Sequence, residues 1–267
     1  MSKFLEDKIR EKLKLREKRY DFERRMRRKR SEEMEVLEEV FDKPTLMALY
    51  NLLNKGYLKE VYGAVKAGKE SKIYWGKSLK GEDLAIKIYL TVSSEFRRGI
   101  LQYIDGDPRF KSIDRSTRAL IYRWALKEFE NLKLAWDAGV RVPRRVAVEK
   151  NVLIMEFIGE DGTPAPLLKE VTLQDPRKTF DLIIEGVEKL YRIVGLVHGD
   201  LSEYNIMIWE DKPVFFDVSQ AVKLDHPMAR TFLRRDLYNI HRFFSKMGID
   251  IPSSEEIYRR VAGEDAE

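Results

Sequence analysis

Two aspartates and one asparagine in the second half of the chain have the types and spacing of a phosphate-transfer site. Asp200 is followed five positions later by Asn205, and Asp217 ends the apolar run Val214-Phe215-Phe216. In the pattern H-R-D-L-x-x-x-N the aspartate orients an acceptor hydroxyl and takes its proton, and the asparagine holds a metal ion. A later aspartate holds metal on the nucleotide phosphates. We therefore predict an ATP-using phosphotransferase, with Asp200 and Asp217 catalytic and with Asn205 and Asp217 as metal ligands.

A lysine on a predicted strand supplies a cation for the phosphates. The run Leu84-Ala85-Ile86-Lys87 matches the V-A-I-K strand, whose lysine pairs with the α- and β-phosphates. Side chains alternate along a strand, so Ala85 and Lys87 share one face. The next predicted helix offers Glu128 and Glu130, which point roughly 200° apart, so only one of them can face the lysine. Glu128 lies on the more apolar face and is the expected partner of Lys87.

Two further segments could hold the rest of a nucleotide. Residues 66–71 form a predicted turn with a single central glycine in place of G-x-G-x-x-G, although taken alone this is an ordinary hairpin turn. The largely apolar run at residues 153–158 predicts a strand that connects the two lobes. Its backbone is expected to form hydrogen bonds with adenine. Besides Lys87 and Glu128, the expected ATP contacts are Gly68, Lys69, Ser71, Glu156 and Ile158.

The elements predicted around these residues form a two-lobed α+β protein. Stretches of strand character, with glycine turns between them, predict a small antiparallel sheet. These strands are expected at 61–65, 71–75, 84–89, 146–148 and 152–157. Helices are expected between Asp42 and Gly56 and at 121–138, 177–194, 228–247 and 254–261. The predicted organisation is a basic helical arm at 1–40, an N-terminal lobe at 41–158 and a C-terminal lobe at 159–267.

The segment from Thr91 to Arg118 lacks clear periodicity, and we expect a mobile loop there. A loop of this length inside a compact domain is usually functional. Because it lies between the lysine strand and the following helix, its hydroxyl groups are expected near the mouth of the cleft. The candidates for autophosphorylation are Ser93, Ser94, Ser112 and Ser116.

The composition excludes several classes of site. The chain of 267 residues is 43% hydrophobic and contains no cysteine, which excludes disulfides, thiolate metal sites and cysteine nucleophiles. Its three histidines are too dispersed for a histidine metal cluster. No apolar run approaches ~18 residues and no signal-peptide pattern opens the chain, so we expect a soluble cytoplasmic protein without a membrane partner.

The positive charge is concentrated in the first thirty residues. This arm holds 14 Lys/Arg against 6 Asp/Glu and ends in the basic run Arg24–Arg30, whereas the rest of the chain is slightly acidic. One interpretation is a solvated, charged helix. The other is a contact with RNA phosphates, in which each neutralised phosphate releases counterions.

The segments around the three polar residues resemble one protein family. The run Asp217-Val218-Ser219-Gln220 is similar to the RIO family of atypical serine/threonine protein kinases, in the archaeal-like subgroup without a winged-helix domain. The family's Ser-Thr-Gly-Lys-Glu-Ala loop matches here only from Gly68 onward, and Gly199 stands at the arginine position of H-R-D. The likeness covers roughly residues 45–262 and rests on His198–Ile206, Phe216–Val222, Lys127–Leu132, Gly139–Pro143, His226–Pro227 and Phe232–Asp236.

This resemblance implies a kinase-like fold trimmed of the peptide-docking subdomain, for which the residues after Asp217 leave no room. It implies ATP with Mg²⁺, or Mn²⁺, as cofactors, ATPase activity beside protein phosphorylation, and a phosphoaspartate route through Asp217. It assigns phosphate anchoring to Lys87, helix pairing to Glu128, catalysis to Asp200 and metal binding to Asn205 and Asp217. The family is associated with maturation of the small ribosomal subunit, whose precursor and RNA would be the partner of the arm at 1–30; the protein substrate is not implied.

Two alternatives come from other classes. Small-molecule phosphotransferases of the aminoglycoside or choline kinase type also use His-Gly-Asp with a downstream asparagine, although the run Ser202-Glu203-Tyr204 and the basic arm argue against them. An RNA-binding pseudokinase scaffold is the other alternative. A scaffold has no physical need to keep every charged catalytic group, and all of them are present.

Overall fold

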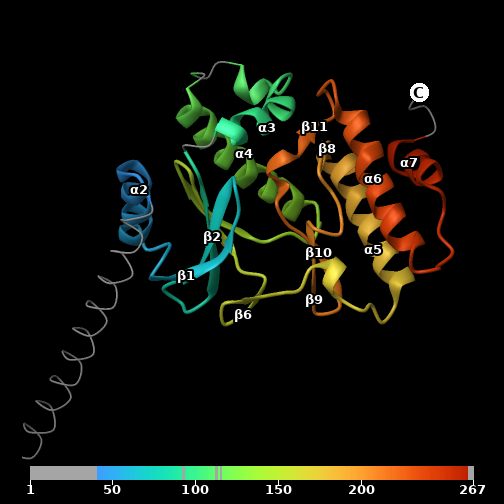
Figure 1. Cartoon of the computed structure of the whole chain (residues 1–267), viewed down its shortest axis with the longest axis horizontal. Helices are drawn as coiled ribbons and strands as arrows, with labels where there is room; N and C mark the ends of the chain where they lie inside the picture. The colour runs from blue at the N-terminus through green and yellow to red at the C-terminus, as the bar shows by residue number, and fades with distance from the viewer. Residues whose placement is uncertain (1–40, 92–93, 112–113, 115, 264–267) are drawn as a thin grey trace, which may run out of the picture.

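The computed structural model of the protein describes residues 41–91, 94–111, 114 and 116–263. The basic arm predicted at 1–40, with its RNA contact at 1–30, lies outside the described residues, as do Ser93 and Ser112. Figure 1 shows helix α2 at one end of the molecule, helices α5, α6 and α7 grouped at the other, and the main sheet between them.

The main sheet has five antiparallel strands in the order β1-β2-β3-β5-β4. The predicted strands all occur, and their bounds are β1 Glu60–Ala67, β2 Ser71–Lys77, β3 Asp83–Tyr89, β4 Arg145–Glu149 and β5 Val152–Glu156. The alternation on β3 divides the core. Leu84 and Ile88 belong to the cluster beneath α2, whereas Ala85 and Tyr89 belong to the cluster on the opposite face. Lys87 therefore leaves the sheet on the face away from α2.

Helix α2 (Lys43–Asn54) begins where the sequence predicts, because Asp42 caps it by accepting the N–H of Thr45 at 3.1 Å. The helix is fastened to the end of β3 by one buried side chain. The amide nitrogen of Asn151, in the β4–β5 turn, donates to Thr45 Oγ1 at 2.9 Å and to the Tyr89 carbonyl at 2.8 Å. We call this connection the Asn151 bridge.

Helix α4 (Thr117–Asp137) covers the other face of the sheet. It begins four residues before the predicted Ile121, because Ser116 caps it through a 3.3 Å hydrogen bond from the N–H of Ala119. Its buried side includes Ile121, Trp124 and Glu128. The helix thus carries one carboxylate into the core beside β3.

The loop predicted from Thr91 to Arg118 is wrong in part. The structure places helix α3 (Ser94–Ile104) and the 3₁₀ turn η1 (Pro108–Phe110) within it. Three residues of α3 are buried at helical spacing, namely Ile100, Tyr103 and Ile104. This short apolar stripe is the sequence pattern that indicates the helix. The stripe packs against the main core, which holds a helix despite Gly99 in its middle.

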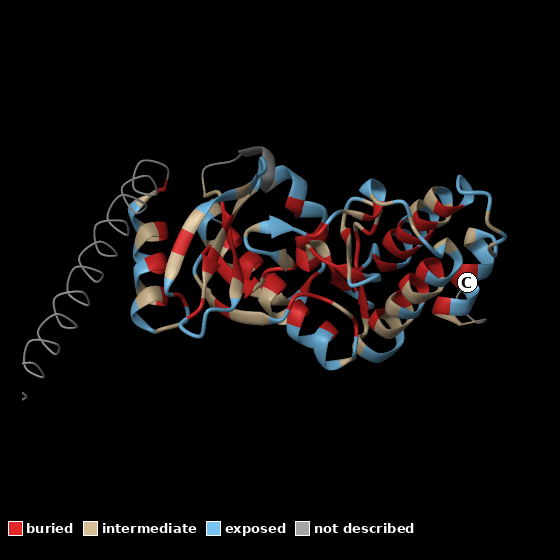
Figure 2. Ribbon diagram, turned by 90° about the horizontal axis from the view of Figure 1, so that it is seen from below, coloured by how far each residue is buried: buried red, intermediate tan, exposed pale blue. Residues whose placement is uncertain are grey.

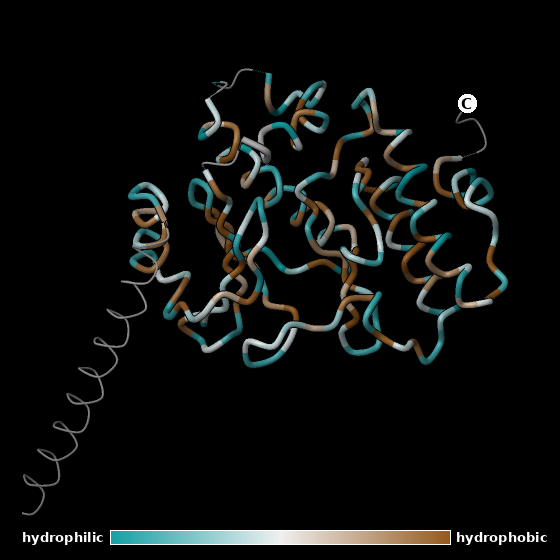
Figure 3. Tube along the Cα trace, viewed as in Figure 1, coloured by the Kyte–Doolittle hydropathy of each residue, from teal (hydrophilic) through white to brown (hydrophobic). Residues whose placement is uncertain are grey.

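The second half of the chain is mainly helical, as predicted. Helix α5 spans Pro176–Lys189 and continues as a π turn at Leu190–Val194, α6 spans Ala229–Ser245 and α7 spans Ser254–Ala262. Apolar positions recur along α5 and α6 in Figure 3, and Figure 2 shows buried residues where these helices face one another. Short strand pairs lie before α5 and between α5 and α6 in the chain. They are β6 (Gly159–Glu160) with β7 (Thr163–Pro164), β8 (Leu196–Val197) with β11 (Val222–Lys223), and β9 (Ile206–Trp209) with β10 (Lys212–Phe215).

Within the described part of the chain, no helix combines the length and apolarity needed to cross a bilayer.

Candidate active site

A cleft with two different ends lies between the sheet and the short strand pairs of the second half. The larger cavity, about 440 Å³, is lined mostly by apolar groups such as Ala85, Met155 and Phe216. The smaller cavity, about 210 Å³, contains Lys87 and Asp217. The two cavities share Lys66, Ile73, Met155 and Phe216, so they form one continuous cleft.

Lys87 joins two carboxylates at the charged end of the cleft. Its Nζ atom lies 2.9 Å from Glu128 Oε1 and 2.8 Å from Asp217 Oδ1. Strand β3 supplies the lysine, α4 supplies Glu128, and Asp217 follows β10 just before the 3₁₀ turn η4 (Val218–Gln220). Of the two glutamates that the sequence offers as partners of Lys87, Glu128 is the one that contacts it.

The charges at this end are set by burial and by pairing. Burial lowers the pKa of Lys87, but the two carboxylates outweigh it and hold that pKa well above its ordinary value. Burial raises the pKa of Glu128, and the donors around it only partly offset the shift. For Asp217 the balance is reversed: burial raises the pKa, but Lys87 and the Ser219 hydroxyl, 2.8 Å away, bring it to about 2. Asp217 is therefore a carboxylate at neutral pH, and 41% of its side chain is exposed to an incoming ligand.

Asp200 and Asn205 form the second polar unit. The amide nitrogen of Asn205 donates to Asp200 Oδ2 at 2.9 Å and to the Asp200 carbonyl at 2.6 Å. Because both donors are directed at Asp200, the amide oxygen of Asn205 is the atom left to accept a further contact. Burial raises the pKa of Asp200, with a further increase from Asp217, while the bond from Asn205 lowers it.

Asp236 on α6 holds the loop that carries Asp200, and sequence reasoning gave it no role. Its two carboxylate oxygens accept the backbone N–H groups of Gly199 at 2.7 Å and of Leu201 at 2.8 Å. Burial raises the pKa of Asp236 to about 7, although both N–H bonds oppose that rise. The signal was present in the sequence, because Asp236 stands in the apolar stripe of α6 between Phe232 and Leu237.

An arginine at position 199, as in H-R-D, would strain the backbone. The φ of Gly199 is +80°, and a Cβ atom there would lie 3.1 Å from the Gln220 carbonyl oxygen. An arginine reaches the same place from α6, since Arg235 donates to the Gly199 carbonyl and, at 3.2 Å, to the Tyr103 hydroxyl. A guanidinium group thus lies beside the Asp200 loop without occupying the H-R-D position.

The remaining predicted contacts lie along the cleft. Gly68, Lys69 and Ser71 line its charged end, where the Gly68 N–H donates to the Ser71 carbonyl at 2.9 Å and closes the β1–β2 turn. Glu156 and Ile158 line the apolar end. Of the described phosphorylation candidates, Ser94 begins α3 and Ser116 caps α4.

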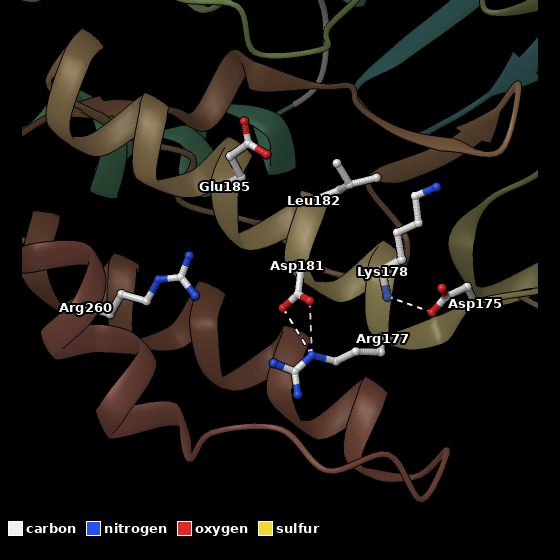
Figure 4. Close-up of a pocket in the computed structure, with 7 residues that line it drawn as sticks. All are labelled: Asp175, Arg177, Lys178, Asp181, Leu182, Glu185 and Arg260. Carbon is white, nitrogen blue, oxygen red and sulfur yellow. Dashed lines mark hydrogen bonds and ion pairs between the residues drawn. The ribbon is translucent and has the colours of Figure 1, made fainter.

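A second hollow lies along α5 and is closed on one side by α7 (Figure 4). Both arginines that line it are already engaged: Arg177 pairs with Asp181 at 3.1 Å, and Arg260 pairs with Glu188 at 2.7 Å. Its carboxylates Asp181 and Glu185 are paired as well, with Arg177 and Lys189, and Leu182 is the one apolar side chain in its lining. The cleft is the better candidate for chemistry.

Known sequences resemble this chain over most of its length. A sequence profile of the RIO domain matches residues 72–257. The chain is 39% identical to the RIO-type serine/threonine-protein kinase Rio1 of Haloferax volcanii over 94% of this chain and 86% of that protein. It is 41% identical to Rio1 of Methanocaldococcus jannaschii over 89% of this chain and 81% of that protein. Human RIO1 is 35% identical over 85% of this chain and 40% of its own length.

Comparison with solved structures concerns the fold. The Rio2 kinase of Chaetomium thermophilum matches with a TM-score of 0.64 at 24% identity, over 84% of this chain and 70% of that chain. The Rio2 kinase–ADP/Mg²⁺–phosphoaspartate complex from the same organism gives a TM-score of 0.61 at 24% identity, over 83% of this chain and 67% of that chain. The kinase-like fold predicted from the sequence is confirmed, and the chain belongs to the RIO family of serine/threonine-protein kinases.

Proposed function

We propose that the cleft binds ATP with a divalent metal ion and transfers its γ-phosphoryl group to serine or threonine, or to water. The observation that carries this proposal is the cleft's asymmetry: an apolar end of base size adjoins an end that contains Lys87 and Asp217. A nucleoside triphosphate has the same asymmetry. A direct test is metal-dependent conversion of ATP to ADP by the full-length protein, with and without a protein acceptor.

The backbone groups at the apolar end suit an adenine edge. The Glu156 N–H donates to the Arg144 carbonyl at 2.8 Å, and the Ile158 carbonyl accepts from Ala165 at 2.9 Å. The Phe157 N–H donates to the Asp83 carbonyl of β3, so the Glu156 carbonyl, on the opposite side of the same peptide group, faces away from that strand. The Glu156 carbonyl and the Ile158 N–H are then the acceptor and donor offered to the base.

The charged end suits triphosphate and Mg²⁺. An ammonium group has three donors, and Lys87 uses two of them on Glu128 and Asp217, which leaves one for a phosphate oxygen. Mg²⁺ is usually held by one or two carboxylates together with substrate phosphates and water. The ionised, partly exposed Asp217 and the amide oxygen of Asn205 fit this requirement, and they would hold the ion against the phosphates. Mn²⁺ accepts the same oxygen ligands.

Asp200 is the group proposed to act on the acceptor. A carboxylate oriented by Asn205 can take the proton of an attacking hydroxyl as the bond to the γ-phosphorus forms. The raised pKa of Asp200 makes this carboxylate a better proton acceptor than an ordinary exposed aspartate. Asp236 and Arg235 hold the backbone on either side of it.

We also propose that Asp217 itself accepts phosphate when no protein acceptor is present. One carboxylate oxygen would attack the γ-phosphorus, the bond to the bridging oxygen would break, and ADP would leave; water would then release inorganic phosphate and regenerate Asp217. We expect incubation with γ-labelled ATP to give an acid-stable, hydroxylamine-labile label that is lost in Asp217→Asn. Label that resists hydroxylamine, or that persists in this variant, contradicts the route.

Asparagine is the suitable replacement because the backbone of Asp217 has φ +60°. Asparagine tolerates this left-handed conformation far better than alanine does, so the variant loses the carboxylate without added backbone strain. Asp211→Asn is the matched control, since Asp211 is exposed in the β9–β10 turn and also has positive φ, at 56°. It should retain the label of the wild type.

The cellular role that we propose is maturation of the small ribosomal subunit, with the basic arm contacting its RNA. Deleting residues 1–30, which carry a net charge of +8, should change ATP turnover little but weaken binding to precursor small-subunit RNA. The log–log salt slope should flatten by ~0.7–0.9 for each phosphate that the arm no longer neutralises. Filter binding at several salt concentrations measures both quantities. Replacing only the basic residues of 24–30 by glutamine is the milder variant, and unchanged affinity and slope in both would leave a solvated helix as the better interpretation.

A small-molecule phosphotransferase is the alternative enzymatic function. No observation in the cleft favours it, since the base and phosphate contacts would be the same. Competition separates the two: a protein kinase should transfer label to protein in preference to aminoglycosides or choline. A pseudokinase scaffold would bind nucleotide without any metal-dependent turnover.

A further inference from the structure

Tyr89 shares the buried carboxylate that holds Lys87. Lys87 and Tyr89 are two residues apart on β3 and therefore point to the same face. They bond different oxygens of one carboxylate: Lys87 Nζ lies 2.9 Å from Glu128 Oε1, and the Tyr89 hydroxyl donates to Glu128 Oε2. We propose that Tyr89 is a positioning residue for phosphate transfer, acting through Glu128 on Lys87.

The hydrogen bond from Tyr89 to Glu128 matters because Lys87, Tyr89 and Glu128 are all buried. Glu128 is fully buried, Tyr89 is 2% exposed and Lys87 is 3% exposed. A carboxylate in such a place has no water to replace a missing donor, and leaving it short of a partner is far more costly than at the surface. Burial already raises the pKa of Glu128, and the Tyr89 hydroxyl is one of the groups that lower it. The hydroxyl therefore favours the ionised form of Glu128, which is the form that attracts Lys87.

Tyr89 is itself rigidly placed. Its N–H donates to the Asn151 carbonyl at 3.0 Å, and its carbonyl accepts from the Asn151 side chain at 2.8 Å. The hydroxyl is thus a fixed donor, because the backbone N–H and C=O of Tyr89 are both bonded to Asn151. With Glu128 fixed at both oxygens, the lysine is held at one position along the cleft, where its third donor can meet a phosphate oxygen.

The test is Tyr89→Phe, which removes one oxygen atom and keeps the ring. We expect kcat/KM for ATP at neutral pH to fall by about 10-fold to 100-fold, the range for a buried charge that loses one donor. The acid limb of the pH profile should move to higher pH, because Glu128 without the hydroxyl takes up a proton more readily. The decrease in kcat/KM should therefore become smaller as pH rises. Tyr74→Phe is the matched control: Tyr74 is also buried on the sheet, but in the cluster under α2.

A double variant separates positioning from a change in packing. In a Glu128→Gln background, Tyr89→Phe should add little, because both changes disturb the same connection to Lys87. All assays are run well below the lowest Tm of the set. Three results overturn the inference. The kcat/KM of Tyr89→Phe could equal that of the wild type, its decrease could be the same at every pH, or its decrease could add fully to that of Glu128→Gln. The inference rests on the proposed ATP chemistry, so absent turnover in the wild type would instead overturn the proposed function.

Discussion

Replacement of Asp200 by asparagine is expected to lower phosphate transfer by about 10²–10⁴-fold, the usual contribution of a positioned general base. The amide has the shape of the carboxylate, and its oxygen can still accept the 2.9 Å bond from Asn205. What the amide cannot do is take the acceptor's proton as the bond to phosphorus forms. Binding of ADP with Mg²⁺ should remain close to that of the wild type. Single-turnover transfer and equilibrium nucleotide titration measure the two quantities separately.

The matched control is Asp225→Asn, which makes the same chemical change at an exposed position before α6. It should transfer phosphate at the wild-type rate. A variant at Asp200 that keeps its rate would remove this residue from catalysis. A variant that loses nucleotide binding as well would mean that the aspartate acts on the metal rather than on the acceptor.

Replacement of Lys87 by methionine is expected to affect both nucleotide use and stability. The phosphates lose their anchor, and the fully buried Glu128 loses its counter-ion. Breaking a buried ion pair in this way typically costs about 3–5 kcal/mol of unfolding free energy. Urea denaturation monitored by fluorescence measures this cost, with Lys80→Met as the control because Lys80 is exposed in the β2–β3 turn.

The cost should depend on pH with a definite sign. Burial already raises the pKa of Glu128, and without Lys87 the folded protein binds a proton there still more readily. The folded state then holds more protons than the unfolded state above the ordinary glutamate pKa, so the stability of the variant should fall as pH rises. Lys87 has a raised pKa, and in the wild type its contribution persists throughout this range below 10.5. The double variant Lys87→Met/Glu128→Gln should recover stability but not activity; a single variant as stable as the wild type would contradict the ion-pair argument.

The alternation on β3 was enough to place Lys87 in advance, because a two-residue period fixes which face each side chain takes. Helical geometry likewise favoured Glu128 over Glu130. The same alternation put Tyr89 on the face of Lys87. From the sequence alone, however, a tyrosine at the end of a strand is expected only to pack in the core, and the hydrogen bond from its hydroxyl to Glu128 is found only in the structure. Asp236 was missed for a related reason. Its place in the apolar stripe of α6 indicates burial, but its partners are backbone N–H groups 35 and 37 residues earlier, and no spacing rule identifies such pairs.

The α3 segment shows a different limit. Its helix depends on three apolar residues that gain partners only when α4 and α6 are in place. The Tyr103 ring, for example, lies 6.2 Å from that of Trp124 on α4 and 5.0 Å from that of Phe232 on α6, between ring centroids. Local sequence preference was too weak to predict it, since Gly99 stands near its centre. Tertiary contacts decide this element.

Through the Asn151 bridge, the position of α2 is coupled to the strand that carries Lys87, and so to the proposed nucleotide site. One amide nitrogen bonds both Thr45 of α2 and Tyr89 at the end of the Lys87 strand, so neither element can move alone without leaving a buried donor unpaired. A partner that binds the chain just before α2 and favours one position of this helix would therefore change the affinity for ATP. Linkage is reciprocal, so ATP would change the affinity for that partner by the same factor.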